Sequence, residues 1–279
     1  MQVIRSVSEM QKWSSTEQGA GRSIGFVPTM GALHSGHGRL FSQSVTDNQR
    51  TVVSIFVNSL QFNNASDLEA YPRQIEQDQV IAERENIDVL FVPQHEEMYP
   101  ESFSSIISTG SIAEHMEGLH RPGHFDGVAT IVVKLLNAVR PRIAYFGQKD
   151  FQQVAVIRQV VRDLNIDCTI ENVPTVRDHL GLALSSRNSR LSPEQLAEAP
   201  SIYSQLLELA EVSRYADTTS DSLKATFVSR IQESTSGVVE YVEVVDSKTL
   251  LSRSHVTSGC TICVAVWFGD VRLIDNVSV

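Results

Sequence analysis

Residues 24–37 read IGFVPTMGALHSGH, and strand-like, turn-like and helix-like residues follow one another within this segment. The run 24–29 is apolar and has the length of a buried strand. Gly31 and Gly36 then permit a tight turn and a close approach of the backbone to a ligand. A helix that begins there points backbone N–H groups at an anion. The segment therefore predicts a strand, a ligand-facing turn and a helix in succession.

Similar apolar runs recur along the first two thirds of the chain, and they predict a parallel sheet. They cover residues 52–57, 89–92, 143–146 and 169–173. Helix-like segments lie between them, at 125–139 and 151–164. Strand–helix alternation is typical of an α/β fold with helices on both faces, so we expect a Rossmann-like, doubly wound sheet. Ligands bind beyond the carboxyl ends of such strands, which here means the residues after Val27, Val57 and Phe146.

The pattern changes after about Pro174. Ser192 and Pro193 form a helix start, with a serine cap and a proline in the first helical position. Two helical segments, 193–213 and 218–234, precede two strand-like runs, 238–245 and 261–268. The sequence therefore predicts two domains, a larger one at 1–175 and a smaller α+β domain with antiparallel strands at 176–279.

Composition narrows the classes of function. The 279 residues carry 23 Lys+Arg and 33 Asp+Glu, a formal net charge of −10. This balance argues against a general binder of nucleic acid or anionic membranes, and it does not exclude a local basic pocket for a phosphorylated small molecule. No apolar run approaches the roughly 20 residues of a membrane span, and the first residues lack the plan of a signal peptide. Three cysteines do not make a disulfide framework, so we expect a cytoplasmic protein.

His34 and His37 form the first candidate site. They stand three residues apart, so both rings can face one side of the turn. Two imidazoles beside a phosphate can donate hydrogen bonds to the charge that develops there. A metal site is the less favoured interpretation, because no third ligand stands nearby. The remaining alternative is a pair of loop histidines without a role.

A second candidate segment reads GQKD at 147–150 and directly follows a predicted strand. Lys149 is well placed there to pair with phosphate oxygens. Asp150 either caps the next helix or takes part in catalysis. Gln152 and Gln153 begin that helix, and one of them should face the same crevice.

Polar side chains in other loops have more than one interpretation. Gln61 follows a predicted strand and can bind a carboxylate, a hydroxyl or an amine. Residues 184–188 read LSSRN, and their two hydroxyls and guanidinium form either a phosphate clamp or an ordinary polar loop. Asp78 is expected on a solvated helix face rather than at a metal. Cys260 and Cys263 have the spacing of half a zinc site, but in a strand they point to opposite faces, so core packing is expected.

Together these segments resemble the pantothenate synthetase family, the pantoate–β-alanine ligases. The resemblance runs in order along nearly the whole chain. It is carried by VPTMGALH at 27–34 with Gly36 and His37, IFVN at 55–58, QF at 61–62, YPR at 71–73, EEMYP at 96–100, RPGHF at 121–125, FGQKD at 146–150, LSSRN at 184–188 and RLIDN at 272–276. A wider resemblance, through the His-Ser-Gly-His turn, is to class I aminoacyl-tRNA synthetases and nucleotidylyltransferases.

The resemblance implies an ATP-dependent ligation in two steps. The carboxylate of pantoate attacks the α-phosphate of ATP to give pantoyl adenylate and pyrophosphate. The amine of β-alanine then displaces AMP to give pantothenate. Mg2+ would bridge phosphate oxygens with few protein ligands, and no metal site made by the protein is expected. The family's usual state implies a homodimer formed through the larger domain, with neither nucleic acid nor membrane as a partner.

The resemblance also implies roles for individual residues. The catalytic set is His34, His37, Lys149 and Arg187, with His37 as proton donor. Gln61 and Gln153 would bind pantoate, and Gln61 would also lie close to β-alanine. The ATP-binding set is Pro28, Thr29, Met30, Gly31, Ala32, Leu33, His34, Ser35, Gly36, His37, Gly147, Gln148, Lys149, Asp150, Val176, Leu184, Ser185, Ser186 and Arg187. The last three would form a mobile clamp on the phosphates, delivered by the second domain.

The chain departs from the family pattern at Gly38, Ser59 and Leu180, and at Trp267, far from the proposed chemistry. Leu180 stands where an Asp normally precedes Gly181, close to the clamp. We therefore expect an effect on rate or clamp movement more than on the type of reaction. Two other interpretations are a nucleotidylyltransferase that transfers AMP to a phosphorylated acceptor and a catalytically silent relative that binds nucleotide or a protein.

Overall fold

The computed structural model describes residues 1–215 and 217–279, and for residues 65 and 66 it describes the backbone alone. By their internal contacts these residues form two compact units. The first comprises Met1–Gln148 and Val156–Val173, and the second comprises Lys149–Ala155 and Pro174–Val279. A short segment after residue 148 is thus grouped with the second unit, and a domain boundary between 175 and 176 stays a prediction.

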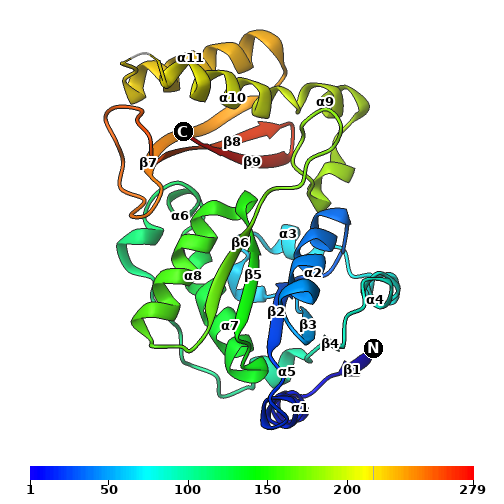
Figure 1. The fold of residues 1–279 in the computed structure, drawn as a ribbon. Coiled ribbons are helices and arrows are strands. Elements are labelled where there is room, and N and C mark those ends of the chain that lie inside the picture. Colours follow the sequence, from blue (N-terminus) through cyan, green and yellow to red (C-terminus); the bar gives the residue numbers. More distant parts are fainter. Residues whose placement is uncertain (216) are drawn as a thin grey trace. The chain divides into compact units, whose positions relative to one another are not determined.

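Six parallel strands form the sheet of the first unit, in the order β1-β4-β3-β2-β5-β6 (Figure 1). They are β1 (Gln2–Ile4), β2 (Ile24–Thr29), β3 (Arg50–Ile55), β4 (Val89–Phe91), β5 (Ile143–Gly147) and β6 (Thr169–Val173). The predicted Rossmann-like parallel sheet is confirmed, and β2 has the predicted bounds. The sequence does not predict β1, because three residues are too few to show a strand period.

One face of this sheet is covered by α2 (Ser35–Asp47) and α4 (Ile75–Arg84), which connect β2 to β3 and lie between β3 and β4 in the chain. Phe41 of α2 and Ala82 of α4 are fully buried in one apolar core, together with strand residues such as Val27. This core packs against the carboxyl end of β2, next to the turn that follows the strand.

The other face is covered by α1 (Val7–Gly19), α7 (His124–Val139) and α8 (Phe151–Asp163). α8 connects β5 to β6, in the direction opposite to the β2–β3 connection, so right-handed crossovers place α8 and α2 on opposite faces. Phe125 of α7 packs with Val156 of α8, and α1 packs against α7. The doubly wound arrangement is therefore confirmed.

Short helical elements lie in the connections. They are η1 (Ser59–Gln61), α3 (Ala65–Glu69), α5 (His95–Met98), η2 (Gly110–Ala113), α6 (Glu117–His120) and η3 (Gln148–Asp150).

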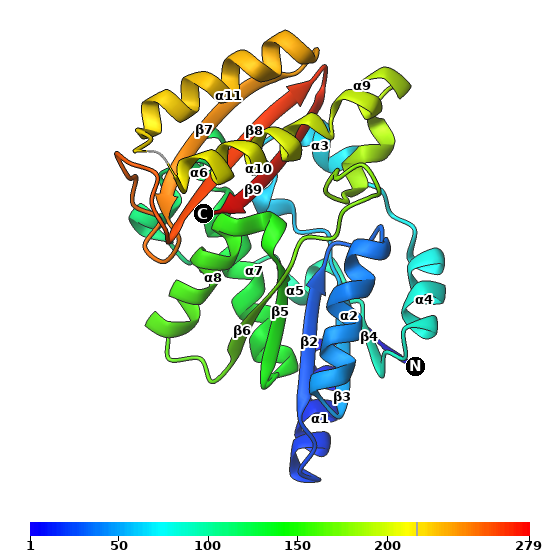
Figure 2. The same ribbon diagram turned by 45° about the horizontal axis from the view of Figure 1, so that its top comes forward.

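The second unit is the predicted small α+β arrangement. Its three antiparallel strands are β7 (Val238–Asp246), β8 (Cys260–Phe268) and β9 (Val271–Ser278), and its helices are α9 (Pro193–Glu198), α10 (Ser201–Ser213) and α11 (Ser220–Ser234), with η4 (Ser186–Arg190) before them. α10 and α11 lie along the strands (Figure 2), and Leu206, Phe227 and Ile262 meet in the core. The single helix predicted at 193–213 is two helices, because Pro200 lacks the N–H that a continuous helix requires.

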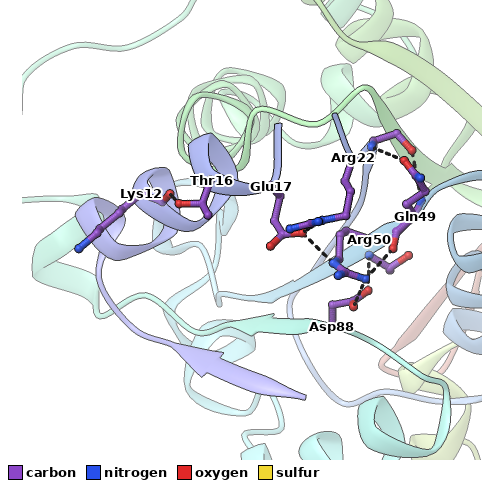
Figure 3. Close-up of polar contacts among 9 residues, drawn as sticks. Lys12, Thr16, Glu17, Arg22, Gln49, Arg50 and Asp88 are labelled. Carbon is purple, nitrogen blue, oxygen red and sulfur yellow. Dashed lines mark hydrogen bonds and ion pairs between the residues drawn. The ribbon is translucent and has the colours of Figure 1, made fainter. Parts of the chain in front are cut away.

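A cluster of charged residues lies at the amino end of β3. Glu17 accepts hydrogen bonds from the guanidinium groups of Arg22 and Arg50, the latter at 2.8 Å (Figure 3). Asp88 lies 3.4 Å from Arg50 and accepts the N–H of Thr51 at 2.8 Å. Hydrogen bonding from Arg22, with a further contribution from Arg50, holds the pKa of the Glu17 carboxyl below its usual range although burial opposes this. These contacts fix the start of β3, at the amino ends of the strands and away from their carboxyl ends.

Candidate active site

β2 and β5 are neighbours in the sheet, and the chain leaves them in opposite directions, from β2 toward β3 and β4 and from β5 toward β6. In doubly wound sheets this reversal opens a crevice beyond the carboxyl ends of the two strands, and ligands bind there. The loop 30–34 follows β2, and Gln148 follows β5. The predicted ATP-binding residues of these two segments therefore lie where the topology favours a ligand.

Thr29 fixes the first turn of the loop after β2. Its hydroxyl donates to the carbonyl oxygen of Ser54 at 2.7 Å and accepts the N–H of Gly31 at 3.1 Å. Gly31 has a φ of +82°, and a Cβ there would lie 3.0 Å from Ile55, so the turn requires glycine. The sequence interpretation of Gly31 as a turn residue is confirmed.

Asp78 lies differently from what the sequence suggests. Its exposed fraction is 1%, and its two carboxylate oxygens accept the N–H groups of Ala32 at 3.0 Å and Leu33 at 2.8 Å. The predicted solvated position is wrong, because α4 buries Asp78 and Ala82, which stand four residues apart on one helix face. Both oxygens therefore act as acceptors for the backbone of the loop.

His34 and His37 begin the helix that the sequence predicts after this turn. His34 Nδ1 accepts the N–H of Gly36 at 3.1 Å, and His37 Nδ1 accepts the N–H of His34 at 3.2 Å. A nitrogen that accepts carries no hydrogen, so the neutral form of each ring has its proton on Nε2. The ring centroids are 4.1 Å apart. Both Nδ1 atoms thus act as acceptors within the loop, and Nε2–H is the group of each neutral ring that donates; imidazole N–H donors suit the charge on a phosphate.

The side-chain amide of Gln61 has a fixed orientation. Asn58 Nδ2 lies 3.1 Å from the carbonyl oxygen of Gly127, which only accepts, so the NH2 of Asn58 must point there. Its Oδ1 then accepts the hydroxyl of Tyr99 at 2.6 Å, and its Nδ2 also donates to Gln61 Oε1 at 2.9 Å. Gln61 is 8% exposed, and its NH2 lies on the side of Met30, 3.1 Å from the sulfur. Gln61 therefore presents a donor.

The backbone of Gln61 is held as well. Its carbonyl oxygen lies 2.8 Å from Nδ1 of the buried His124 and accepts from Arg121 at 3.3 Å. Because a carbonyl only accepts, Nδ1 of His124 carries the hydrogen. A Cβ at Gly127 would lie 2.5 Å from the carbonyl oxygen of Leu60, so only glycine lets α7 come this close to η1. Residues 121–125 therefore support the backbone of Gln61 through Arg121 and His124.

A cavity of about 430 Å3 lies beside the loop after β2. Met30 and Gly31 are the predicted site residues that line it, with Phe56, Val57 and Arg73 among the others. The loop thus has packed contacts on the Gln61 side and open space next to it.

In the second unit, the residues after β5 are tied to β9. The carbonyl oxygen of Lys149 accepts from Asn276 at 3.1 Å, and Lys149 Nζ lies 3.9 Å from Asp150. Gln152 is buried, and Gln153 is half-buried. The predicted helix begins at Phe151, directly after Asp150.

The predicted ATP-binding residues Val176 and Leu184 lie on one irregular hairpin of the second unit, and the predicted clamp residues 185–187 follow it directly. Val176 and Leu184 pair across it, with the carbonyl of Val176 accepting the N–H of Leu184 at 2.9 Å. Ser185 then caps η4, since its hydroxyl accepts the N–H of Arg187 at 3.2 Å. Ser186 and Arg187 follow in η4 and are both half-buried. These five predicted residues therefore lie on the hairpin and on the short helix that directly follows it.

The base of this hairpin is anchored by Arg177. Its guanidinium binds both oxygens of Asp275, at 2.6 and 2.8 Å, and lies over the ring of Tyr203. Asp178 accepts the N–H groups of Leu180 and Leu182, each at 2.9 Å. The side chain of Leu180 is mostly exposed. The hairpin turn is thus closed by Asp178, and the departure at Leu180 adds an exposed apolar side chain without removing these bonds.

The three cysteines are free thiols, and Cys260 and Cys263 are buried in β8, as core packing requires. Among residues 1–215 and 217–279, no group of three or more His, Cys, Asp or Glu side chains is placed to hold a metal ion. Over the same residues, no helix is both long and apolar enough to cross a membrane.

Comparison with known sequences decides the family. The profile described as pantoate-beta-alanine ligase matches residues 2–278. The chain belongs to the pantoate-beta-alanine ligase family. Among similar members, the pantothenate synthetase of Acetivibrio thermocellus is 44% identical over 279 residues, which cover 100% of this chain and 99% of that protein. The pantothenate synthetase of Bacteroides fragilis is 45% identical over 280 residues, covering 99% and 98%.

Solved structures of pantoate-beta-alanine ligases have the same fold. The pantothenate synthetase of Thermus thermophilus superposes with a TM-score of 0.93 at 40% identity, over 100% of this chain and 99% of the other. The enzyme of Francisella tularensis, solved in complex with beta-gamma ATP and beta-alanine, superposes with a TM-score of 0.83 at 35% identity, over 100% and 97%. The family expected from the sequence is confirmed.

Sequence reasoning missed the residues that hold the site of this pantoate-beta-alanine ligase in shape. Asn58 stands only three residues before Gln61, but Asp78, Tyr99 and His124 stand far along the chain from the residues they support. Tyr99 lies 41 residues from Asn58, and His124 lies 63 residues from Gln61. The family motifs IFVN, EEMYP and RPGHF contain Asn58, Tyr99 and His124, and this is the signal in the sequence that points to these three residues.

Proposed function

We propose that this chain condenses pantoate with β-alanine to pantothenate, using ATP and passing through a pantoyl-adenylate intermediate. One observation carries the proposal most directly. The paired Nε2–H groups of His34 and His37 follow the β2 strand end, in the same unit as a buried Gln61 whose NH2 is fixed as a donor. An enzyme that adenylates a carboxylic acid needs hydrogen-bond donors for the phosphates of ATP and a further donor for the oxygen atoms of the acid.

In the first step, an oxygen of the pantoate carboxylate attacks the α-phosphorus of ATP. A C–O–P linkage forms, the bond from the α-phosphorus to the bridging oxygen breaks, and pyrophosphate leaves. His34 and His37 donate hydrogen bonds to the phosphate oxygens on which negative charge grows. Lys149 and Arg187 supply positive charge for the phosphates, and Arg187 can bind two oxygens at once.

In the second step, the neutral amine of β-alanine attacks the acyl carbon of the adenylate. An amide bond forms, the acyl–oxygen bond breaks so that this oxygen leaves with AMP, and the nitrogen releases one proton to the solvent. A free carboxylate is a poor acyl donor, so the first step is what makes the second possible. Holding the amine and the acyl group close together in the right orientation further raises the rate of this step.

Gln61 and Gln153 are proposed to bind pantoate. Gln61 offers its NH2, so its partner on the substrate is an acceptor such as a carboxylate or hydroxyl oxygen. The resemblance places Gln61 near β-alanine too. This pair of uncharged amides favours a small hydroxy acid over the phosphorylated acceptor that a nucleotidylyltransferase would bind.

The resemblance also implies Mg2+. We propose that Mg2+ enters with ATP and is held mainly by phosphate oxygens and water, and no step above is assigned to it. A homodimer and a cytoplasmic location stay predictions from the sequence and its resemblance.

The test is AMP release by the purified protein with ATP, magnesium and pantoate, with and without β-alanine. We expect sustained release of AMP, with pantothenate as product, when β-alanine is present. Pantoate labelled with 18O in its carboxylate should transfer one labelled oxygen to AMP. Label in inorganic phosphate instead would indicate an acyl phosphate and contradict the adenylate. No AMP from protein that still binds ATP would favour the silent relative.

A further inference from the structure

We infer that Asp78 is a positioning residue for this reaction, acting through the loop that leads to His34 and His37. The inference rests on the proposed function of that loop. Asp78 stands on α4, 46 residues from Ala32 in the sequence, and it is almost completely buried. Its carboxylate binds the backbone of the loop, and Asp78 also lines the cavity beside the loop.

The loop needs an outside anchor because of its conformation. Gly31 and Ala32 have φ values of +82° and +51°, and the left-handed region is unfavourable for alanine. Successive backbone N–H groups in such a turn point inward together and form a concavity that binds an anion. Here the anion is the carboxylate of Asp78, which takes one N–H on each oxygen, at 3.0 and 2.8 Å.

This arrangement has a consequence for the nucleotide. The N–H groups of Ala32 and Leu33 are engaged by the protein's own carboxylate. The N–H of Gly36, at the start of α2, is engaged by His34. A phosphate at this strand end is therefore expected to meet the imidazole Nε2–H groups, whose place depends on the loop. A shift of about 1 Å in such groups can lower a rate by about 100-fold.

Asp78→Asn is the variant that tests this. The amide has nearly the same shape but a single acceptor, so its NH2 would face the N–H of Ala32 or Leu33 and one bond would be lost. We expect kcat for AMP release to fall about 10- to 100-fold, while binding of pantoate alone changes less than threefold. A matched control is Asp88→Asn, which removes the same kind of carboxylate–amide bond at the amino end of β3. That control should keep the wild-type kcat.

Hydrogen exchange of the Ala32 and Leu33 amides measures their hydrogen bonds to Asp78 independently of enzyme activity. In the wild type we expect both amides to be protected like those of β2, and in Asp78→Asn we expect their exchange to accelerate while that of β2 does not. Fast exchange of both amides in the wild type would overturn the inference even if the variant fails to fold. A normal kcat in a folded Asp78→Asn, or an equal loss in Asp88→Asn, would overturn it as well. An inactive wild type with protected amides would instead count against the proposed function.

Discussion

The hydroxyl of Tyr99 donates to Oδ1 of Asn58 at 2.6 Å, and this bond helps to determine which end of the Gln61 amide faces outward. With Oδ1 occupied by Tyr99, the NH2 of Asn58 is left for Gly127 and Gln61. Gln61 must then accept with Oε1 and offer Nε2–H. A residue 41 positions away from Asn58 thus fixes the hydrogen-bonding character of the proposed substrate contact.

Tyr99→Phe is expected to weaken pantoate binding. Removing the hydroxyl leaves Oδ1 of Asn58 buried without its donor, so only the bond to Gly127 still orients the Asn58 amide and Gln61 is held less firmly. We expect the KM for pantoate to rise about 3- to 10-fold and the free energy of unfolding to fall by about 1–2 kcal/mol. The KM for ATP should change little. The measurements are steady-state kinetics and urea unfolding.

Tyr145→Phe is the matched control for this variant. Tyr145 is also buried in the first unit, and its hydroxyl bonds to Asn48 at 2.7 Å and Asp47 at 3.1 Å, away from Gln61. It should lose stability by a similar amount and keep the pantoate KM. Equal rises of KM in both variants would show that the effect is general loosening of the unit.

Gly127→Ala should damage the same contact from the backbone side. A Cβ at this position would lie 2.5 Å from the carbonyl oxygen of Leu60 and 2.8 Å from the N of Gln61, so α7 and η1 must separate. We expect lower stability, by about 1–3 kcal/mol, and a higher pantoate KM. Gly38→Ala is the opposite case, because a Cβ there meets only the flexible end of Glu85, at 3.5 Å.

Gly38→Ala is therefore expected to raise the free energy of unfolding by about 0.5–1 kcal/mol, since it removes a glycine from inside α2. Urea unfolding of the two variants side by side tests the pair. Destabilisation by Gly38→Ala would mean that α2 requires glycine at this position.

His37→Ala is expected to reduce adenylate formation about 100- to 1,000-fold, as removal of a donor to developing phosphate charge usually does. Folding should persist, because the ring is half-buried and contributes one acceptor to the start of α2. A single-turnover measurement of pyrophosphate release is the direct assay. His255→Ala, in the second unit, is the control. Wild-type turnover in His37→Ala would remove this residue from the mechanism.

The sequence predicts the framework of the site well and its supports poorly. Local patterns of apolar residues and glycine predict the strand, turn and helix at 24–37. The structure confirms this prediction, because β2 and α2 lie where the pattern places them. Asp78 is missed because a carboxylate in an amphipathic helix normally faces water, and nothing in the spacing reveals that Ala32 needs an acceptor. Tyr99 and His124 are missed because their partners become neighbours only when the sheet forms. Local patterns therefore predict the candidate site residues, and long-range contacts determine how these residues are held.

Glu17→Gln tests how much the charged cluster at the amino end of β3 stabilises the fold. The pKa of Glu17 is lowered, chiefly by hydrogen bonding from Arg22, so its ion pairs contribute stability above the usual carboxyl pKa of about 4.5, and this contribution is lost as the pH falls through the lower folded value. We expect the variant to be less stable than the wild type by about 1 kcal/mol at pH 7, with a smaller difference at pH 3. AMP release should be unaffected, because these residues lie at the amino end of β3. Urea unfolding at both pH values is the measurement, with Glu9→Gln, exposed on the same helix, as control. A difference that persists unchanged at pH 3 would show that Glu17 acts through packing rather than through its charge.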